Sequence, residues 1–170
     1  MQLDVTRAIQ SPGEAFPFDI LEGHQPEEWA GDTMTFDGPI HVSGSVTVLS
    51  DVVQVRAKVK ASVCVPCANC LDDARYTLAA EMDENFVRDA DKAEEDDFTY
   101  EGHTLELDDA VMGTIFMNMP MRILCKPDCK GLCPRCYQNL NHAACSCPKE
   151  LSSKNPFAAL ASLLNQDEEV

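Results

Sequence analysis

The chain has 170 residues and a formal net charge of −16, with 29 acidic and 13 basic residues. This length supports one hydrophobic core with a small appended module. The charge argues against a simple electrostatic nucleic-acid binder, because contacts with phosphates need a basic surface.

Neither a membrane span nor an export signal is predicted. The sequence contains no run of about eighteen apolar residues, so we expect no membrane partner. Its N-terminal residues lack a basic start followed by an apolar block, which a signal peptide would need. We therefore expect a cytoplasmic protein, in which clustered cysteines serve as metal ligands rather than disulfides.

The N-terminal segment, residues 1–33, mixes prolines, glycines, acids and scattered apolar residues. Short strands are predicted at 3–9 and 16–21, and one helical turn is predicted at 27–30. Nothing in this segment indicates chemistry.

A β-rich body is predicted over residues 34–120. Its first strands are expected at 34–36 and 40–49, and Asp37-Gly38-Pro39 between them is typical of a turn.

Two longer strands follow. Apolar and polar residues alternate from 53 to 63 and again from 74 to 82, the period of a half-buried antiparallel strand. Together these strands predict a long hairpin, and Cys67 and Cys70 lie at its tip.

The rest of the body contains a loop, a strand and a helix. Residues 88–97 are densely charged and predict a solvated loop, and 98–107 predict a short strand. A helix is predicted over 108–119, with Asp108 as its N-cap and Pro120 ending it. Val111, Met112, Ile115, Phe116 and Met119 follow at helical spacing, and we expect this face to pack in the core.

A Cys-rich arm, residues 121–149, follows the helix and has no periodicity. The last segment, 150–170, opens with Asn155-Pro156-Phe157, which predicts a short C-terminal helix, and ends in an acidic tail. The arm holds six of the nine cysteines: Cys125, Cys129, Cys133, Cys136, Cys145 and Cys147.

The cysteines are spaced as metal ligands. Spacings of one to three residues let a tight turn aim two sulfur atoms at one point, as a tetrahedral four-cysteine zinc site requires. One interpretation has two sites, with the hairpin pair completing the first. Its groups are Cys67, Cys70, Cys125 and Cys129, and then Cys133, Cys136, Cys145 and Cys147.

A rival interpretation has one site within the arm, for example Cys129, Cys133, Cys136 and Cys147. Cys64 lies on the polar side of its strand and belongs to neither interpretation. We therefore expect one or two structural zinc ions.

No enzyme is predicted. A catalytic zinc keeps an open position and commonly uses histidine or a carboxylate, whereas a set this rich in thiols favours a closed structural site. The sequence lacks the HExxH, GxSxG and P-loop motifs, so we expect no catalytic residue and no small-molecule substrate.

An ordered series of motifs runs along the chain. It comprises Cys67-x2-Cys70-Leu71, Leu105-Glu106-Leu107-Asp108 before a helix ending Met119-Pro120-Met121, the stretch from Cys129 to Cys136, Asn139-Leu140-Asn141, Cys145-Ser146-Cys147 and Asn155-Pro156-Phe157-Ala158-Ala159-Leu160. Over roughly residues 34–164 this series resembles the bacterial YceD-like family, the large ribosomal RNA subunit accumulation proteins. The chain departs from the family pattern at Tyr137, where glycine is usual, and at Asn69, where arginine is frequent.

The resemblance implies a ribosome-biogenesis factor that supports accumulation or processing of 23S rRNA and assembly of the large subunit. Its partner would be 23S rRNA or a pre-ribosomal particle, reached through local positive charge on the arm. The expected phosphate contacts are Arg122, Lys126, Lys130 and Arg135.

Two alternatives follow from other features of the chain. The overall acidity suits a chaperone-like binder of a basic ribosomal protein. Zinc-bound thiolates can be oxidised, which would suit a redox sensor.

The predicted fold class is α+β: an antiparallel β-sheet body, one central helix, a Cys-rich zinc-binding arm and a short C-terminal helix.

Overall fold

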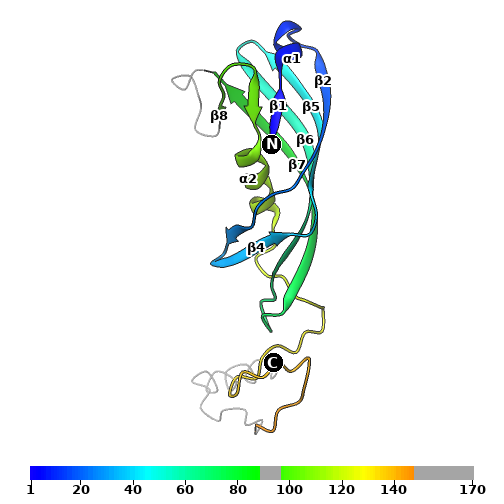
Figure 1. The fold of residues 1–170 in the computed structure, drawn as a ribbon, viewed down its shortest axis with the longest axis vertical. Coiled ribbons are helices and arrows are strands. Elements are labelled where there is room, and N and C mark those ends of the chain that lie inside the picture. Colours follow the sequence, from blue (N-terminus) through cyan, green and yellow to red (C-terminus); the bar gives the residue numbers. More distant parts are fainter. Residues whose placement is uncertain (89–96, 148–170) are drawn as a thin grey trace, which may run out of the picture. The chain divides into compact units, whose positions relative to one another are not determined.

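A computed structural model describes residues 1–88 and 97–147. Its centre is the hairpin of β6 (Val52–Pro66) and β7 (Asp73–Val87), the two longest strands in the described residues. They pair antiparallel along their whole length, from Val52 opposite Val87 to Pro66 opposite Asp73. Figure 1 shows this hairpin extending beyond the rest of the sheet to a narrow tip. The two segments with strictly alternating residues therefore form the long hairpin that the sequence predicted.

The sheet continues on the other side of β6. β5 (Ile40–Leu49) pairs antiparallel with β6, and β2 (Ala15–Glu22) pairs antiparallel with β5. Nearer the tip, β4 (Asp32–Phe36) pairs with β6 and β3 (Glu27–Trp29) pairs with β4.

The predicted turn between the fourth and fifth strands is a bulge instead. β4 and β5 run in the same direction along one edge of β6, with Phe36 opposite Val63 and His41 opposite Lys60. The N–H of Asp37 donates to the carbonyl of Ser62, at 2.7 Å, so the chain stays beside β6. Extra residues on one strand bend a sheet without reversing the chain.

Two predictions in the N-terminal segment were wrong. The expected strand at 3–9 is a short strand, β1 (Gln2–Asp4), followed by a helix, α1 (Thr6–Gln10). The reason is local, because the carboxylate of Asp4 accepts the N–H of Thr6, at 2.8 Å, and turns the chain.

The expected helical turn at 27–30 is a hairpin, in which β3 pairs with β4. Ala30 and Gly31 form the connection with φ angles of 54° and 86°. Positive φ at both positions is the signature of a tight two-residue hairpin loop.

Short strands complete the body. β8 (Phe98–Thr99) pairs parallel with the end of β7, and β9 (Thr104–Glu106) pairs antiparallel with β1 in a separate two-stranded sheet. The strand predicted over 98–107 is therefore two strands with different partners.

The helix α2 (Asp108–Asn118) packs against β6 and β7, and Figure 1 shows it along one face of the sheet. Val111 and Ile115 are fully buried, and Met112 and Met119 are nearly so, which confirms the predicted core face at these four positions. Phe116 is only half-buried, so its ring lies at the edge of the core. Asp108 is not the N-cap, because the helix begins at Asp108 and the cap position belongs to Leu107 without a side-chain hydrogen bond.

The described residues are mostly antiparallel β-sheet with two helices, which is consistent with the α+β class. Contacts divide the chain into two compact units, Met1–Lys130 and Gly131–Val170. The predicted C-terminal helix and tail, 150–170, lie outside the described residues. In the described part of the chain, no helix is long and apolar enough to cross a membrane.

Candidate metal centres

Eight thiols form two groups of four. In each group every sulfur atom lies within 4.8 Å of the others. Site 1 consists of Cys67, Cys70, Cys125 and Cys129 in the first unit, and site 2 consists of Cys133, Cys136, Cys145 and Cys147 in the second unit.

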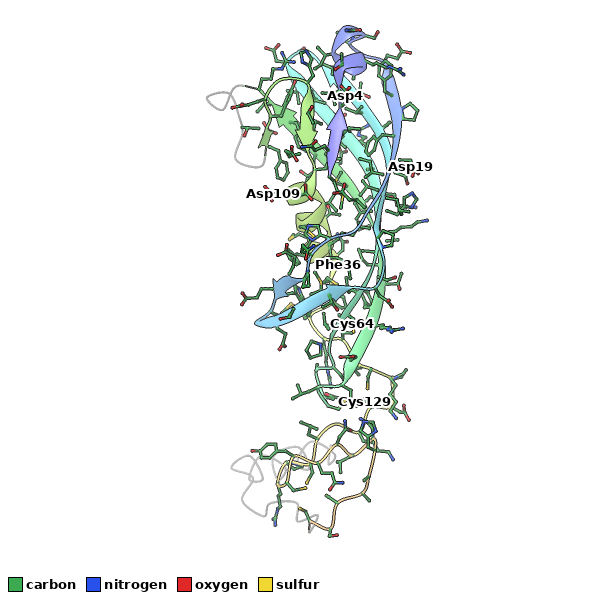
Figure 2. The ribbon with its side chains drawn as sticks, in the orientation of Figure 1. Asp4, Asp19, Phe36, Cys64, Asp109 and Cys129 are labelled. Atoms are coloured by element: carbon green, nitrogen blue, oxygen red, sulfur yellow. The ribbon has the colours of Figure 1, made fainter. Side chains whose placement is uncertain are left out.

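Site 1 joins the hairpin tip to the segment that follows α2. Cys67 and Cys70 lie in the connection between β6 and β7 and are buried, with 0% and 3% of their surface exposed. Figure 2 shows the labelled Cys129 beside this tip. The N–H of Ala68 donates to the carbonyl of Ile123, at 2.9 Å, so the backbone also holds the two segments together.

The sulfur spacing at site 1 matches a tetrahedral metal centre. The sulfurs of Cys67 and Cys129 are 3.7 Å apart, and those of Cys70 and Cys125 are 3.5 Å apart. Four sulfurs at about 2.3 Å from a tetrahedral zinc would lie about 3.8 Å from one another. Both distances are close to this value, so these thiols could hold a tetrahedral metal ion such as zinc.

Each site contains a Cys-x2-Cys turn, and the two turns have the same hydrogen bonds. In site 1 the N–H of Leu71 donates to the carbonyl of Cys67, at 3.0 Å, and in site 2 Tyr137 donates to Cys133, at 2.9 Å. The residue after the second cysteine has a left-handed backbone in both turns, with φ of 63° at Leu71 and 58° at Tyr137. Both turns leave a large side chain exposed at this position.

Site 2 is built locally. Leu132 and Asn139 form an antiparallel bridge, and the N–H of Leu140 donates to the carbonyl of Gly131, at 2.9 Å. Cys133 is buried, whereas Cys136 is exposed. Site 2 is therefore more open to solvent than site 1.

The thiols of site 1 differ in acidity when no metal is present. Burial raises the pKa of Cys67, but backbone hydrogen bonds from Asn69, Cys125 and Cys70 outweigh it and lower the pKa to about 6. Burial dominates at Cys70 and Cys125 and raises the pKa of both thiols. One sulfur is therefore ready to bind a cation, and these two others must first release a proton.

Site 2 shows the same division. Backbone N–H groups of Cys136 and Arg135 lower the pKa of Cys133 to about 6. The neighbouring Cys136 thiol, together with burial, raises the pKa of Cys147 to about 12. A thiolate held by backbone donors beside protonated thiols is a suitable first ligand for zinc.

Both groups of thiols lie in the part of the chain that matches a known protein family. Residues 55–164 match the family described as "Large ribosomal RNA subunit accumulation protein YceD". The chain belongs to the YceD family. This match confirms the resemblance inferred from the motifs. The description of the family implies a role in accumulation of the RNA of the large ribosomal subunit.

Relatives of this YceD-family chain occur in mycobacteria. It is 25% identical over 143 residues to an uncharacterized protein of Mycobacterium bovis and to uncharacterized proteins of Mycobacterium tuberculosis. The alignment covers 80% of this chain and 69% of each relative. No solved structure matches.

The structure brings together the eight cysteines of the two-site interpretation, in the same two groups. In the rival grouping Cys129 would join Cys133, Cys136 and Cys147, but its sulfur lies among those of site 1. Cys64 stands apart from both sites, on β6 opposite Arg75. No histidine belongs to either group.

The four cations predicted to contact phosphate are all exposed: Arg122, Lys126, Lys130 and Arg135. The first three belong to the unit that contains site 1, and Arg135 lies in the Cys-x2-Cys turn of site 2. The guanidinium of Arg122 donates to the side-chain oxygen of Asn69, at 2.7 Å. Asn69 thus positions a cation, a role that sequence spacing could not reveal because the two residues are 53 positions apart.

Proposed function

We propose that the chain is a non-catalytic ribosome-biogenesis factor. It supports the accumulation and processing of 23S rRNA and the assembly of the large ribosomal subunit in the cytoplasm. The observation that carries this proposal is the family match over residues 55–164, which spans both groups of thiols.

In this proposal each group of thiols holds one structural zinc ion. Four thiolates complete a tetrahedral coordination sphere and leave no position for a reactive water. Zinc at site 1 would hold the hairpin tip against residues 123–129, and zinc at site 2 would hold the local loops of the second unit. The metal contributes shape and stability, and no catalytic step is assigned to it.

The proposed RNA contacts use the cations near the thiols. Arg122 is exposed, and its hydrogen bond to Asn69 orients the guanidinium at the surface, where planar donors suit phosphate oxygens. Lys126 and Lys130 lie in the same unit on the segment that carries two ligands of site 1. Zinc binding would therefore order the backbone from which these cations project.

Binding to 23S rRNA at several salt concentrations tests the direct contact. A double variant, Lys126→Ala/Lys130→Ala, is expected to weaken binding and to reduce the salt slope by roughly 1.4 to 1.8, since each phosphate contact contributes about 0.7 in single strands and about 0.9 in a DNA duplex. Lys58→Ala/Lys60→Ala is the matched control, because it removes the same charge from exposed positions on β6. Equal salt slopes for the two double variants would contradict the proposed contacts.

A second candidate function follows from the charge of −16. An acidic chain attracts basic ribosomal proteins, and exposed acids such as Glu81 and Asp83 on β7 would take part. Purified ribosomal proteins of the large subunit, tested in place of rRNA, distinguish the two functions. Tight capture of one of them without measurable affinity for 23S rRNA would favour the chaperone-like function.

A further inference from the structure

Tyr137 is an aromatic side chain that the structure holds in solvent. Its surface is 75% exposed, and among the strongly exposed large apolar side chains of the described residues it is the aromatic one. It directly follows Cys136, the exposed thiol of site 2. The ring of Tyr137 therefore does not contribute to packing of the core in the described residues.

The backbone at Tyr137 has a conformation that side chains other than glycine rarely adopt. The Cys-x2-Cys turn holds the residue at a φ of 58°, a left-handed conformation that glycine adopts without penalty. Its N–H is fixed by the bond to the carbonyl of Cys133. A tyrosine here bears a steric cost without gaining burial, as Leu71 does at the equivalent position of site 1, and the feature that distinguishes Tyr137 is its aromatic ring.

The surroundings of Tyr137 differ in charge from the rest of the chain. Residues 131–147 contain no aspartate or glutamate, although the whole chain carries 29 acidic residues. Arg135, two positions before Tyr137, is exposed. A zinc ion at site 2 would also neutralise part of the thiolate charge. Residues 131–147 therefore carry no carboxylate that would repel the phosphates of an RNA backbone.

We propose that Tyr137 is a stacking platform for an unpaired RNA base. Aromatic rings bind unpaired bases through their faces, and this contact does not require a net positive protein. It is thus a mode of RNA contact open to an acidic chain. The metal-braced turn fixes the ring in place, and the guanidinium of Arg135 contacts the adjoining phosphate.

This inference rests on the proposed function and specifies the kind of RNA that site 2 contacts. The test uses the full zinc-loaded chain with labelled oligouridylate and oligoadenylate of about ten nucleotides, within the usual site size. An RNA duplex of the same length is the competing probe. The variants are Tyr137→Phe and Tyr137→Gly, and Leu71→Gly is the matched control at the equivalent position of site 1.

Tyr137→Gly is expected to weaken single-strand binding by about 5- to 150-fold, the range of losses when one stacked base loses its aromatic partner. Tyr137→Phe keeps the ring and is expected to stay within about 2-fold of the parent chain, because stacking needs the π face and not the hydroxyl. Duplex binding and the effect of Leu71→Gly are expected to remain near the parent values. Because glycine suits the left-handed position, Tyr137→Gly is expected to keep both metal ions, and elemental analysis verifies this.

Three outcomes overturn the inference. If the parent chain binds 23S rRNA but Tyr137→Gly binds single strands equally well, the stacking role fails while the proposed function stands. If the parent chain binds neither the oligonucleotides nor 23S rRNA, the stacking role and the direct RNA contact fail together. Loss of binding to a ribosomal protein in Tyr137→Gly, without an RNA effect, would likewise reassign the ring to a protein interface.

Discussion

The sulfur atoms of Cys67 and Cys129 lie 3.7 Å apart, although 62 positions separate the two residues in the chain. The strand β7 and the helix α2 lie in the sequence between them. A metal at site 1 would therefore close a long loop and fix the hairpin tip to the segment after the helix. Closing a loop of this length stabilises a protein by about 4 kcal/mol in the chain-entropy treatment.

Cys129→Ser is expected to remove one of two zinc ions per chain and to lower the free energy of unfolding of the first unit by up to about 4 kcal/mol. Elemental analysis and denaturant unfolding measure the two effects. Cys64→Ser is the control, since Cys64 lies outside both sites, and it is expected to keep both ions. A Cys129→Ser chain that still bound two zinc ions would contradict the grouping.

The two sites are expected to lose metal in a fixed order. Cys136 is exposed, whereas Cys67 and Cys70 of site 1 are buried, so chelators and peroxide reach site 2 first. Zinc release followed with a chromogenic chelator should show a fast and a slow phase of equal amplitude. Cys136→Ser should remove the fast phase, whereas Cys70→Ser should remove the slow one.

Much of this structure was predictable because its signals are local. Alternation with period two reports directly which face of β6 and β7 is buried. The Cys-x2-Cys pairs predict tight turns because their geometry depends on only a few residues. For the same reason the two-site interpretation could be formulated from spacing alone.

Other features depend on partners far away in the sequence. Asp37-Gly38-Pro39 favours a bend, but pairing with β6 decides that the bend is a bulge and not a reversal. The side chain of Asn69 acquires its role from Arg122, which lies after α2. Choosing between the two groupings of thiols likewise required the position of the hairpin tip.

Gly44 on β5 is expected to tolerate no side chain. A Cβ atom there would lie 2.1 Å from the carbonyl oxygen of Arg56 and 2.5 Å from the Cα of Ala57, both backbone atoms of β6. Backbone atoms cannot move aside without breaking the pairing of the two strands. Gly44→Ala should lower the free energy of unfolding by about 1–3 kcal/mol or more.

Gly113→Ala on α2 is the control for Gly44→Ala, because a Cβ atom there meets nothing within 4 Å. Alanine is also the better helix former, so this change should be neutral or stabilising by up to about 1 kcal/mol. Denaturant unfolding of both variants measures the contrast. Equal stability of the two variants would contradict the close approach of β5 and β6.

Leu71→Gly is expected to stabilise the turn of site 1. Leu71 has a φ of 63°, and its side chain is 67% exposed, so little packing is lost with it. Relief of the left-handed strain contributes about 1 kcal/mol, partly offset by the greater freedom of glycine in the unfolded chain. Leu71→Val should have the opposite effect, because a β-branched residue resists positive φ more strongly. Thermal unfolding of the zinc-loaded chains ranks the three proteins.

The zinc affinity of both sites is expected to rise with pH. In the metal-free chain the pKa of Cys70 and Cys125 is raised by burial, and the pKa of Cys147 is raised to about 12. These thiols are protonated at neutral pH, whereas Cys67 and Cys133, with pKa values of about 6, are largely ionised. The zinc-bound chain holds fewer protons than the free chain, so affinity must rise with pH and fall as the solution is acidified.

At neutral pH, zinc should displace at least two protons at site 1, from Cys70 and Cys125, and at least one at site 2, from Cys147. Calorimetric titrations in buffers with different heats of ionisation count these protons. Below a pH of about 6 the thiols of Cys67 and Cys133, whose pKa is lowered, also become protonated. The zinc affinity of both sites should then fall more steeply as the pH decreases. A zinc affinity that did not change between pH 6 and pH 8 would show that these sulfur atoms are not the ligands.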